Sequence, residues 1–234
     1  MNEKKEVVEY IYNIKWNNNT ETIKLKLTPD RMSFDPDYLE KNKYPEWVKL
    51  DFKQCDICPL DKKKNKVCPA ALSIMKIIYS FKDMLSFENA TVEIITPERK
   101  IVNDVQMQEA LSSVMGLTLS LSDCPILAQF SSMGRFHLPF STIEETIFRT
   151  TGSYLLKQYF VKKNGGTPDW DLKGLKEFYN KVSLVNGNLV ERIRSGSIKD
   201  ASVNALVKLD TYAKNFQYLF DNTMKILEEI FGQD

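Results

Sequence analysis

Residues 7–27 read VVEYIYNIKWNNNTETIKLKL, and this stretch decides the expected fold of the N-terminal part of the chain. Aromatic and β-branched side chains alternate between two faces from Val7 to Trp16. After the polar residues 17–20, Ile23, Leu25 and Leu27 share one face. Alternation with a period of two on both sides of a short polar turn predicts an antiparallel β-hairpin.

Segments beyond this hairpin extend the same unit. A loop rich in Asp and Pro is expected over residues 28–45, and Val48–Phe52 is a third strand candidate. A helix is expected after Cys68, running to about Leu85, because its apolar residues recur at helical spacing. Residues 91–96 and 99–102 flank Pro97-Glu98 as a second hairpin. The N-terminal unit is therefore predicted to be an antiparallel sheet with one packed helix.

The hydrophobic pattern becomes helical near residue 105. Residues 107–121 form the first expected helix, and Ser141-Thr-Ile-Glu144 matches a capping box for a helix that runs to Lys163. Residues 164–166 (Asn-Gly-Gly) should end that helix, and residues 167–169 (Thr-Pro-Asp) should begin the next. The last helix is predicted to be continuous, with an apolar stripe that packs within a bundle. The stripe comprises Leu206, Leu209, Ala213, Phe216, Phe220, Leu227 and Ile230.

These patterns predict an α+β fold, with an antiparallel N-terminal sheet and one packed helix followed by a mainly α-helical C-terminal half. The boundary is expected near residue 105. Residues 1–105 would form a β-rich unit that carries Cys55, Cys58 and Cys68, and residues 106–234 a helical unit that carries Cys124 and His137. One continuous domain is the alternative.

Composition limits the classes of function. The chain has 234 residues, 43% hydrophobic and 27% charged, with a formal net charge of +1, which is typical of a globular protein. The balanced charge argues against a general nucleic-acid-binding surface. Neither a secretory signal nor an apolar run long enough to span a membrane is visible, so a cytoplasmic location is expected. A protein partner is left open.

The four cysteines are the strongest chemical signal. They fall as Cys55-x2-Cys58-x9-Cys68-x55-Cys124, and proline follows each of the last three. Four thiols with one close pair match the ligand count of a tetrahedral zinc site or an iron–sulfur cluster. Proline is favoured at the first position of a helix, so Cys68 and Cys124 are expected at helix N-termini, where the thiolate is stabilised.

Two other interpretations of the cysteines stay open. Free cysteines are often simply buried, but the polar sequence around Cys55 and Cys58 is poor core. Disulfides are disfavoured in the cytoplasm. A site formed by Cys55, Cys58, Cys68 and Cys124 is therefore the leading hypothesis. The single close pair and the Cys-Pro steps tilt the choice toward an iron–sulfur cluster over Zn²⁺.

His137, the only histidine, marks a second candidate site. Together with Arg135 and Glu145 it would supply a proton-transfer group and charged partners to an enzyme. The apolar residues around it favour a structural role instead. In that case the imidazole should be at least half buried and should bond to a backbone carbonyl, Glu144 or Glu145.

Several blocks of the chain together resemble a bacterial protein family of unknown function. The resemblance covers most of the chain and implies no activity, ligand or partner. The blocks are Cys55-x-x-Cys58-Pro59-Leu60, Cys68-Pro69, Cys124-Pro125, Arg135-Phe-His-Leu-Pro-Phe140, Glu145-Thr-x-x-Arg149, Tyr154-Leu-Leu156 and Asp200-Ala-x-x-Asn204-Ala205.

Two functions are therefore carried forward. The preferred one is a cytoplasmic protein with a four-cysteine metal or iron–sulfur site and a regulatory, sensory or scaffold role. The alternative is an enzyme with its active site around His137 and Arg135 and with structural cysteines.

Overall fold

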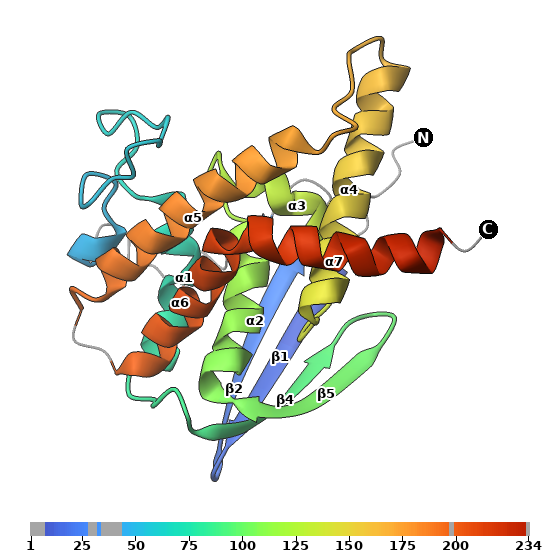
Figure 1. The fold of residues 1–234 in the computed structure, drawn as a ribbon. Helices are drawn as coiled ribbons and strands as arrows, with labels where there is room; N and C mark the ends of the chain where they lie inside the picture. The colour runs from blue at the N-terminus through green and yellow to red at the C-terminus, as the bar shows by residue number, and fades with distance from the viewer. Residues whose placement is uncertain (1–7, 28–31, 34–43, 197–198, 233–234) are drawn as a thin grey trace, which may run out of the picture.

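A computed structural model describes residues 8–27, 32–33, 44–196 and 199–232 of the chain. Its N-terminal part is a five-stranded sheet in the order β3-β2-β1-β4-β5, and every neighbouring pair is antiparallel. The strands are β1 (Val8–Trp16), β2 (Asn19–Leu27), β3 (Met32–Ser33), β4 (Asn89–Ile95) and β5 (Lys100–Gln106). The predicted hairpins are confirmed, and Figure 1 shows the long strands side by side.

The alternation in sequence becomes an alternation in burial. In β1, Tyr12 and Ile14 are fully buried, while Ile11 and Asn13, which alternate with them, contact solvent in part. The register pairs Tyr12 with Ile23 and Trp16 with Asn19, so only residues 17 and 18 form the turn. Asn17 has a positive φ of 49°, a conformation that Asn tolerates better than most residues. One face of the sheet thus enters the core.

Helices cover this buried face. The helix α2 (Met107–Ser120) packs against β4 and β5 and contacts both α1 (Pro69–Ser80) and α6 (Asp200–Lys214). Figure 1 shows α2 crossing in front of the strands. The helix α1 begins at Pro69 as predicted but ends at Ser80 rather than near Leu85, because turns follow Phe81.

The third strand candidate, Val48–Phe52, is wrong. Residues Glu46–Val48 form a short 3₁₀ helix, η2, and the strand-like pairing that follows is a single bridge between Lys49 and Val67. A distant side chain explains the difference. Arg192 donates hydrogen bonds to carbonyls of this segment, so those acceptors are satisfied without a neighbouring strand.

The C-terminal half is helical, as predicted. It contains η3 (Leu127–Phe130), α3 (Ser131–Arg135), α4 (Ile143–Lys163), α5 (Lys173–Ile193), α6 and α7 (Phe216–Phe231). One hydrophobic cluster includes residues from the sheet, α1, α2, α5 and α6. The loop predicted over residues 28–45 lies mostly outside the described residues. Within the described part of the chain, we find no helix that has both the length and the apolarity to cross a membrane.

Two helix starts differ from the predicted ones. The capping box of α4 is formed by Thr142 and Glu145, one residue later than expected. The segment at residues 167–169 is a loop, and α5 begins only at Lys173, after Leu172 in the left-handed conformation. The side chain of Asp169 accepts hydrogen bonds from the N–H of Gly174 at 2.7 Å and from the Tyr154 hydroxyl at 2.9 Å. Asp169 thus satisfies a free N–H of the new helix from outside it.

The predicted last helix is broken at Asn215 into α6 and α7. The ring of Phe216 stacks on that of Tyr179 in α5, with 3.6 Å between ring centroids. The stripe is buried at Leu206, Ala213, Phe216 and Phe220, but Ile230 is 63% exposed. The C-terminal end of the apolar stripe, at Ile230, therefore does not pack into the core.

Candidate functional site

The cysteines come from three places in the fold. Cys55 and Cys58 lie in the loop after η2, where the N–H of Cys58 donates to the carbonyl of Cys55 at 2.9 Å. Cys68 is the N-cap of α1, with Pro69 at the first helical position, as predicted. Cys124 follows α2, and the chain then enters the 3₁₀ helix η3 rather than an α-helix. All four thiols are free.

The four thiols are near enough to influence one another. Burial raises the pKa of the Cys55 thiol to about 12, and the negative charges that Cys68, Cys58 and Cys124 would carry as thiolates raise it further. Burial also raises the pKa of Cys124, and Cys68 and Cys58 add to this effect. The fold thus brings the loop before α1 and the segment after α2 into one neighbourhood.

Backbone donors face the sulfur of Cys124. Hydrogen bonds from the N–H groups of Leu127 and Ile126 lower the pKa of this thiol, against the larger effect of burial. At Cys68, the backbone N–H donates to the carbonyl of Val48 at 2.8 Å and so holds the start of α1 against η2, from which the loop with Cys55 and Cys58 continues. Donated N–H groups stabilise a thiolate over a thiol.

A buried cation acts on Cys55. The Arg192 side chain has no exposed surface and donates to the carbonyls of Trp47 (3.0 Å), Lys49 (2.7 Å) and Leu50 (3.2 Å). Among the described residues, no carboxylate lies within ion-pair distance of its guanidinium. Its positive charge lowers the pKa of Cys55. A buried charge is costly unless an opposite charge compensates it.

The chemistry of these residues suits a metal ion or an iron–sulfur cluster, but their arrangement in this structure does not form a metal site. Four thiols, two N–H donors to sulfur and one buried cation are the groups that a thiolate-bound centre of negative charge requires. In the described residues, no three His, Cys, Asp or Glu side chains are arranged so that they could hold a metal ion.

His137 lies in a separate environment from this cluster. Its Nε2 atom and the Tyr12 hydroxyl are 2.9 Å apart and share a hydrogen bond, and the Tyr12 hydroxyl is 3.3 Å from that of Ser113. The imidazole is largely buried, as predicted, but its partner is a tyrosine of β1. The prediction that the imidazole bonds to a backbone carbonyl, Glu144 or Glu145 is therefore wrong.

Burial lowers the pKa of His137 to about 3, and the charge of Arg149 contributes to this shift. The imidazole is therefore neutral at physiological pH and a weak base. The carboxylate of Glu145 accepts the N–H of Thr142 at 2.7 Å in the capping box of α4. Arg135 ends α3, and its buried Nη1 has no hydrogen-bond partner among the described residues.

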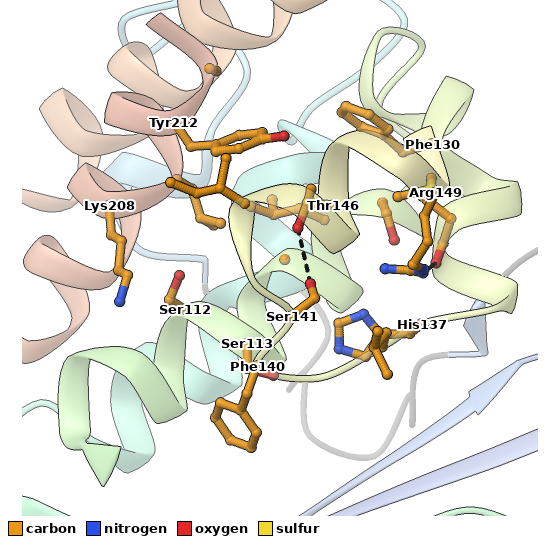
Figure 2. A pocket seen from close by; sticks show the side chains of 18 of the residues that line it. Ser112, Ser113, Phe130, His137, Phe140, Ser141, Thr146, Arg149, Lys208 and Tyr212 are labelled. Carbon is orange, nitrogen blue, oxygen red and sulfur yellow. Dashed lines mark hydrogen bonds between the residues drawn. The ribbon is translucent and has the colours of Figure 1, made fainter. Parts of the chain in front are cut away.

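A cavity of about 470 Å³ opens beside His137. It is lined by residues of α2, α4, α5 and α6 and of the segment from Leu127 to Ile143. Figure 2 shows His137 and Arg149 together on one side of it and Ser112 and Lys208 on the other. The predicted residue Arg135 is not among its lining residues. The signal for this cavity in the sequence is the run of small residues in α2, Ser112, Ser113 and Gly116, on a helix that is otherwise largely apolar.

The fold and these two sites define a class of protein: an α+β chain whose antiparallel sheet is covered on one face by helices, with a thiol cluster and a separate cavity. The chain belongs to the family described as Domain of unknown function (DUF6901), whose model matches residues 8–232. The curated proteins and the solved structures contain no match to the chain.

Proposed function

We propose that the chain binds a metal centre through Cys55, Cys58, Cys68 and Cys124, with an iron–sulfur cluster favoured over Zn²⁺. One observation supports the proposal: the Cys55 thiol feels the charges of Cys58, Cys68 and Cys124 and of Arg192, a buried arginine that has no carboxylate partner among the described residues. A centre with four thiolate ligands carries net negative charge, which Arg192 would compensate.

The proposed centre would act as a regulatory, sensory or scaffold element. Cys68 begins α1 and Cys124 follows α2, and these two helices pack against each other. Binding would draw the sulfurs together and so couple the metal or redox state to the packing of α1 on α2. The proposal places the protein in the cytoplasm, where thiols are kept reduced and available as ligands.

Metal binding would release protons. Because burial raises the pKa of Cys55 to about 12 and also raises that of Cys124, both sulfurs are protonated thiols at neutral pH without a metal. A metal binds the thiolate, so affinity should rise with pH.

Elemental analysis of protein purified without oxygen tests the proposal. Iron and acid-labile sulfide, with a brown colour, would identify a cluster, and one zinc per chain would identify a zinc site. Cys58→Ser and Cys124→Ser should each lose the bound metal. Asp56→Asn, an exposed change between two of the ligands, should keep it. Protein that holds neither metal as purified and takes up neither after anaerobic reconstitution would overturn the proposal.

Catalysis around His137, the second function considered, has weaker support. The imidazole does line a cavity, which an active site requires. However, a pKa of about 3 makes it a poor proton acceptor at neutral pH, and neither Arg135 nor Glu145 lies with it in the cavity lining. A pH-rate profile with an inflection set by His137 would be needed to support this alternative.

A further inference from the structure

The cavity beside His137 is kept open by the sequence of α2. Gly116 lies within this largely buried helix, where glycine is less favourable than alanine. Close packing does not require it, since a Cβ atom there would meet only Leu209 Cδ2, at an ordinary 3.7 Å. Both residues line the cavity. The missing side chain therefore leaves space that the fold does not fill.

Buried polar groups point to a ligand in this space. Asn186 on α5 is only 4% exposed and Ser112 on α2 only 9%, and both line the cavity. Neither side chain has a hydrogen-bond partner in the described part of the chain. Because both residues line the cavity, their polar atoms are open to hydrogen bonds from a molecule bound there. A bound molecule with polar atoms would satisfy them.

The charge of the cavity is positive. Lys208 at its edge is neutralised by Glu109, with 2.6 Å between Nζ and Oε1. His137 is neutral, since its pKa is lowered to about 3. Arg149 donates through Nη2 to the carbonyls of Phe136 and Met133, and no carboxylate within residues 8–27, 44–196 and 199–232 is within ion-pair distance of it. Arg149 is thus a cation beside the cavity that has no ion-pair partner among the described residues, although the charge of Glu145 acts on it from a greater distance.

Apolar side chains form much of the remaining wall, among them Leu119, Val182, Leu209 and Ala213. The volume of about 470 Å³ falls in the range of small-molecule sites, roughly 300–1,000 Å³. A ligand that suits this wall has an apolar body, and one that suits Arg149 has a single negative charge.

We propose that this cavity binds a small amphipathic monoanion, an organic acid whose carboxylate lies toward Arg149 and His137 and whose apolar body extends between α2 and α6. The polar groups of Ser112 and Asn186 would bond to polar atoms elsewhere on the natural ligand. This site is distinct from the cysteine cluster, and the proposal does not depend on a metal.

Decanoate serves as the probe, with decan-1-ol as its uncharged counterpart. Calorimetric titration of the full chain at pH 7.5 should show at least tenfold tighter binding of decanoate, since only the carboxylate gains a charge-assisted bond to Arg149. Equal affinity for the two probes, or binding of neither, would overturn the proposal without the need for any variant.

Two leucine variants test whether the probe occupies the cavity. Gly116→Leu fills it and should weaken decanoate binding at least tenfold. Gly152→Leu is the matched control, because a Cβ at Gly152 on α4 meets no atom within 4 Å, and its affinity should equal that of the unmodified chain. Binding to Gly116→Leu at full strength would place the probe elsewhere and refute the assignment.

Arg149→Met tests the charge. It should bring the affinity for decanoate down to that for decan-1-ol, while circular dichroism reports whether the helices persist. Retained preference for decanoate in a folded Arg149→Met protein would show that another group binds the anion.

Discussion

His137 should lower the free energy of unfolding of the protein in mild acid. Its pKa is about 3 in the folded protein, against an ordinary value of 6.5 for an imidazole in the unfolded chain. Between these values the unfolded chain binds a proton that the folded chain does not, so the free energy of unfolding falls as the pH falls. The groups that face the imidazole are Tyr10, Tyr12 and Arg149. The two tyrosines stay neutral in this range and Arg149 stays charged, so none of them offsets the loss.

The magnitude follows from the width of this window. Each pH unit well inside it removes about 1.4 kcal/mol of stability, so acidification from pH 7 to 4.5 should remove about 3 kcal/mol. A typical domain has about 5–15 kcal/mol in total, so the loss is a substantial fraction of the whole.

Urea unfolding of His137→Gln at pH 7 and pH 4.5 measures this contribution. Glutamine keeps a donor and an acceptor but does not titrate, so the variant should lose about 3 kcal/mol less than the unmodified chain between the two pH values. Tyr12→Phe is the control, because it removes the hydrogen bond yet leaves a buried histidine, and it should retain the full pH dependence. Parallel pH profiles for His137→Gln and the unmodified chain would refute the reasoning.

Two further predictions concern stability. Thr142→Ala removes the observed capping box of α4 and should lower the free energy of unfolding by about 1 kcal/mol in urea. Glu144→Gln should change it by less than about 0.5 kcal/mol. A larger effect of Glu144→Gln would show that the capping box is at Ser141, as the sequence predicted. Gly134→Ala should destabilise by about 1–3 kcal/mol, because its Cβ would lie 2.5 Å from Ser120 Oγ and 2.8 Å from Leu121 Cγ. Gly152→Ala, with open space around it, is the matched control in thermal melts.

Short-range patterns predicted the elements that depend on local chemistry. Alternating side chains predicted β1 and β2 nearly to their ends, because a half-buried strand requires apolar residues at every second position. The capping box of α4 was predicted one residue too early, because Ser141 and Thr142 each precede a glutamate by three positions. Both matched the motif, and the local sequence offers no means to choose between them.

Long-range contacts decided the elements that were predicted wrongly. The segment at Val48–Phe52 lacks a strand because Arg192, more than 140 residues later, satisfies its carbonyls. The last helix breaks at Asn215 where Phe216 stacks on Tyr179. Such contacts depend on where two distant segments lie in space, which no local period encodes.

The candidate sites divide in the same way. The sequence alone determined that the chain has an N-terminal sheet and a helical C-terminal half, since periodicity is a local property, and its four cysteines led to the prediction of a metal site. Only the tertiary structure brought the charge of Arg192 near Cys55, paired His137 with Tyr12, and left a cavity lined by α2, α4, α5 and α6. These features arise from the packing of segments far apart in the chain, and packing is decided by shape and burial in three dimensions.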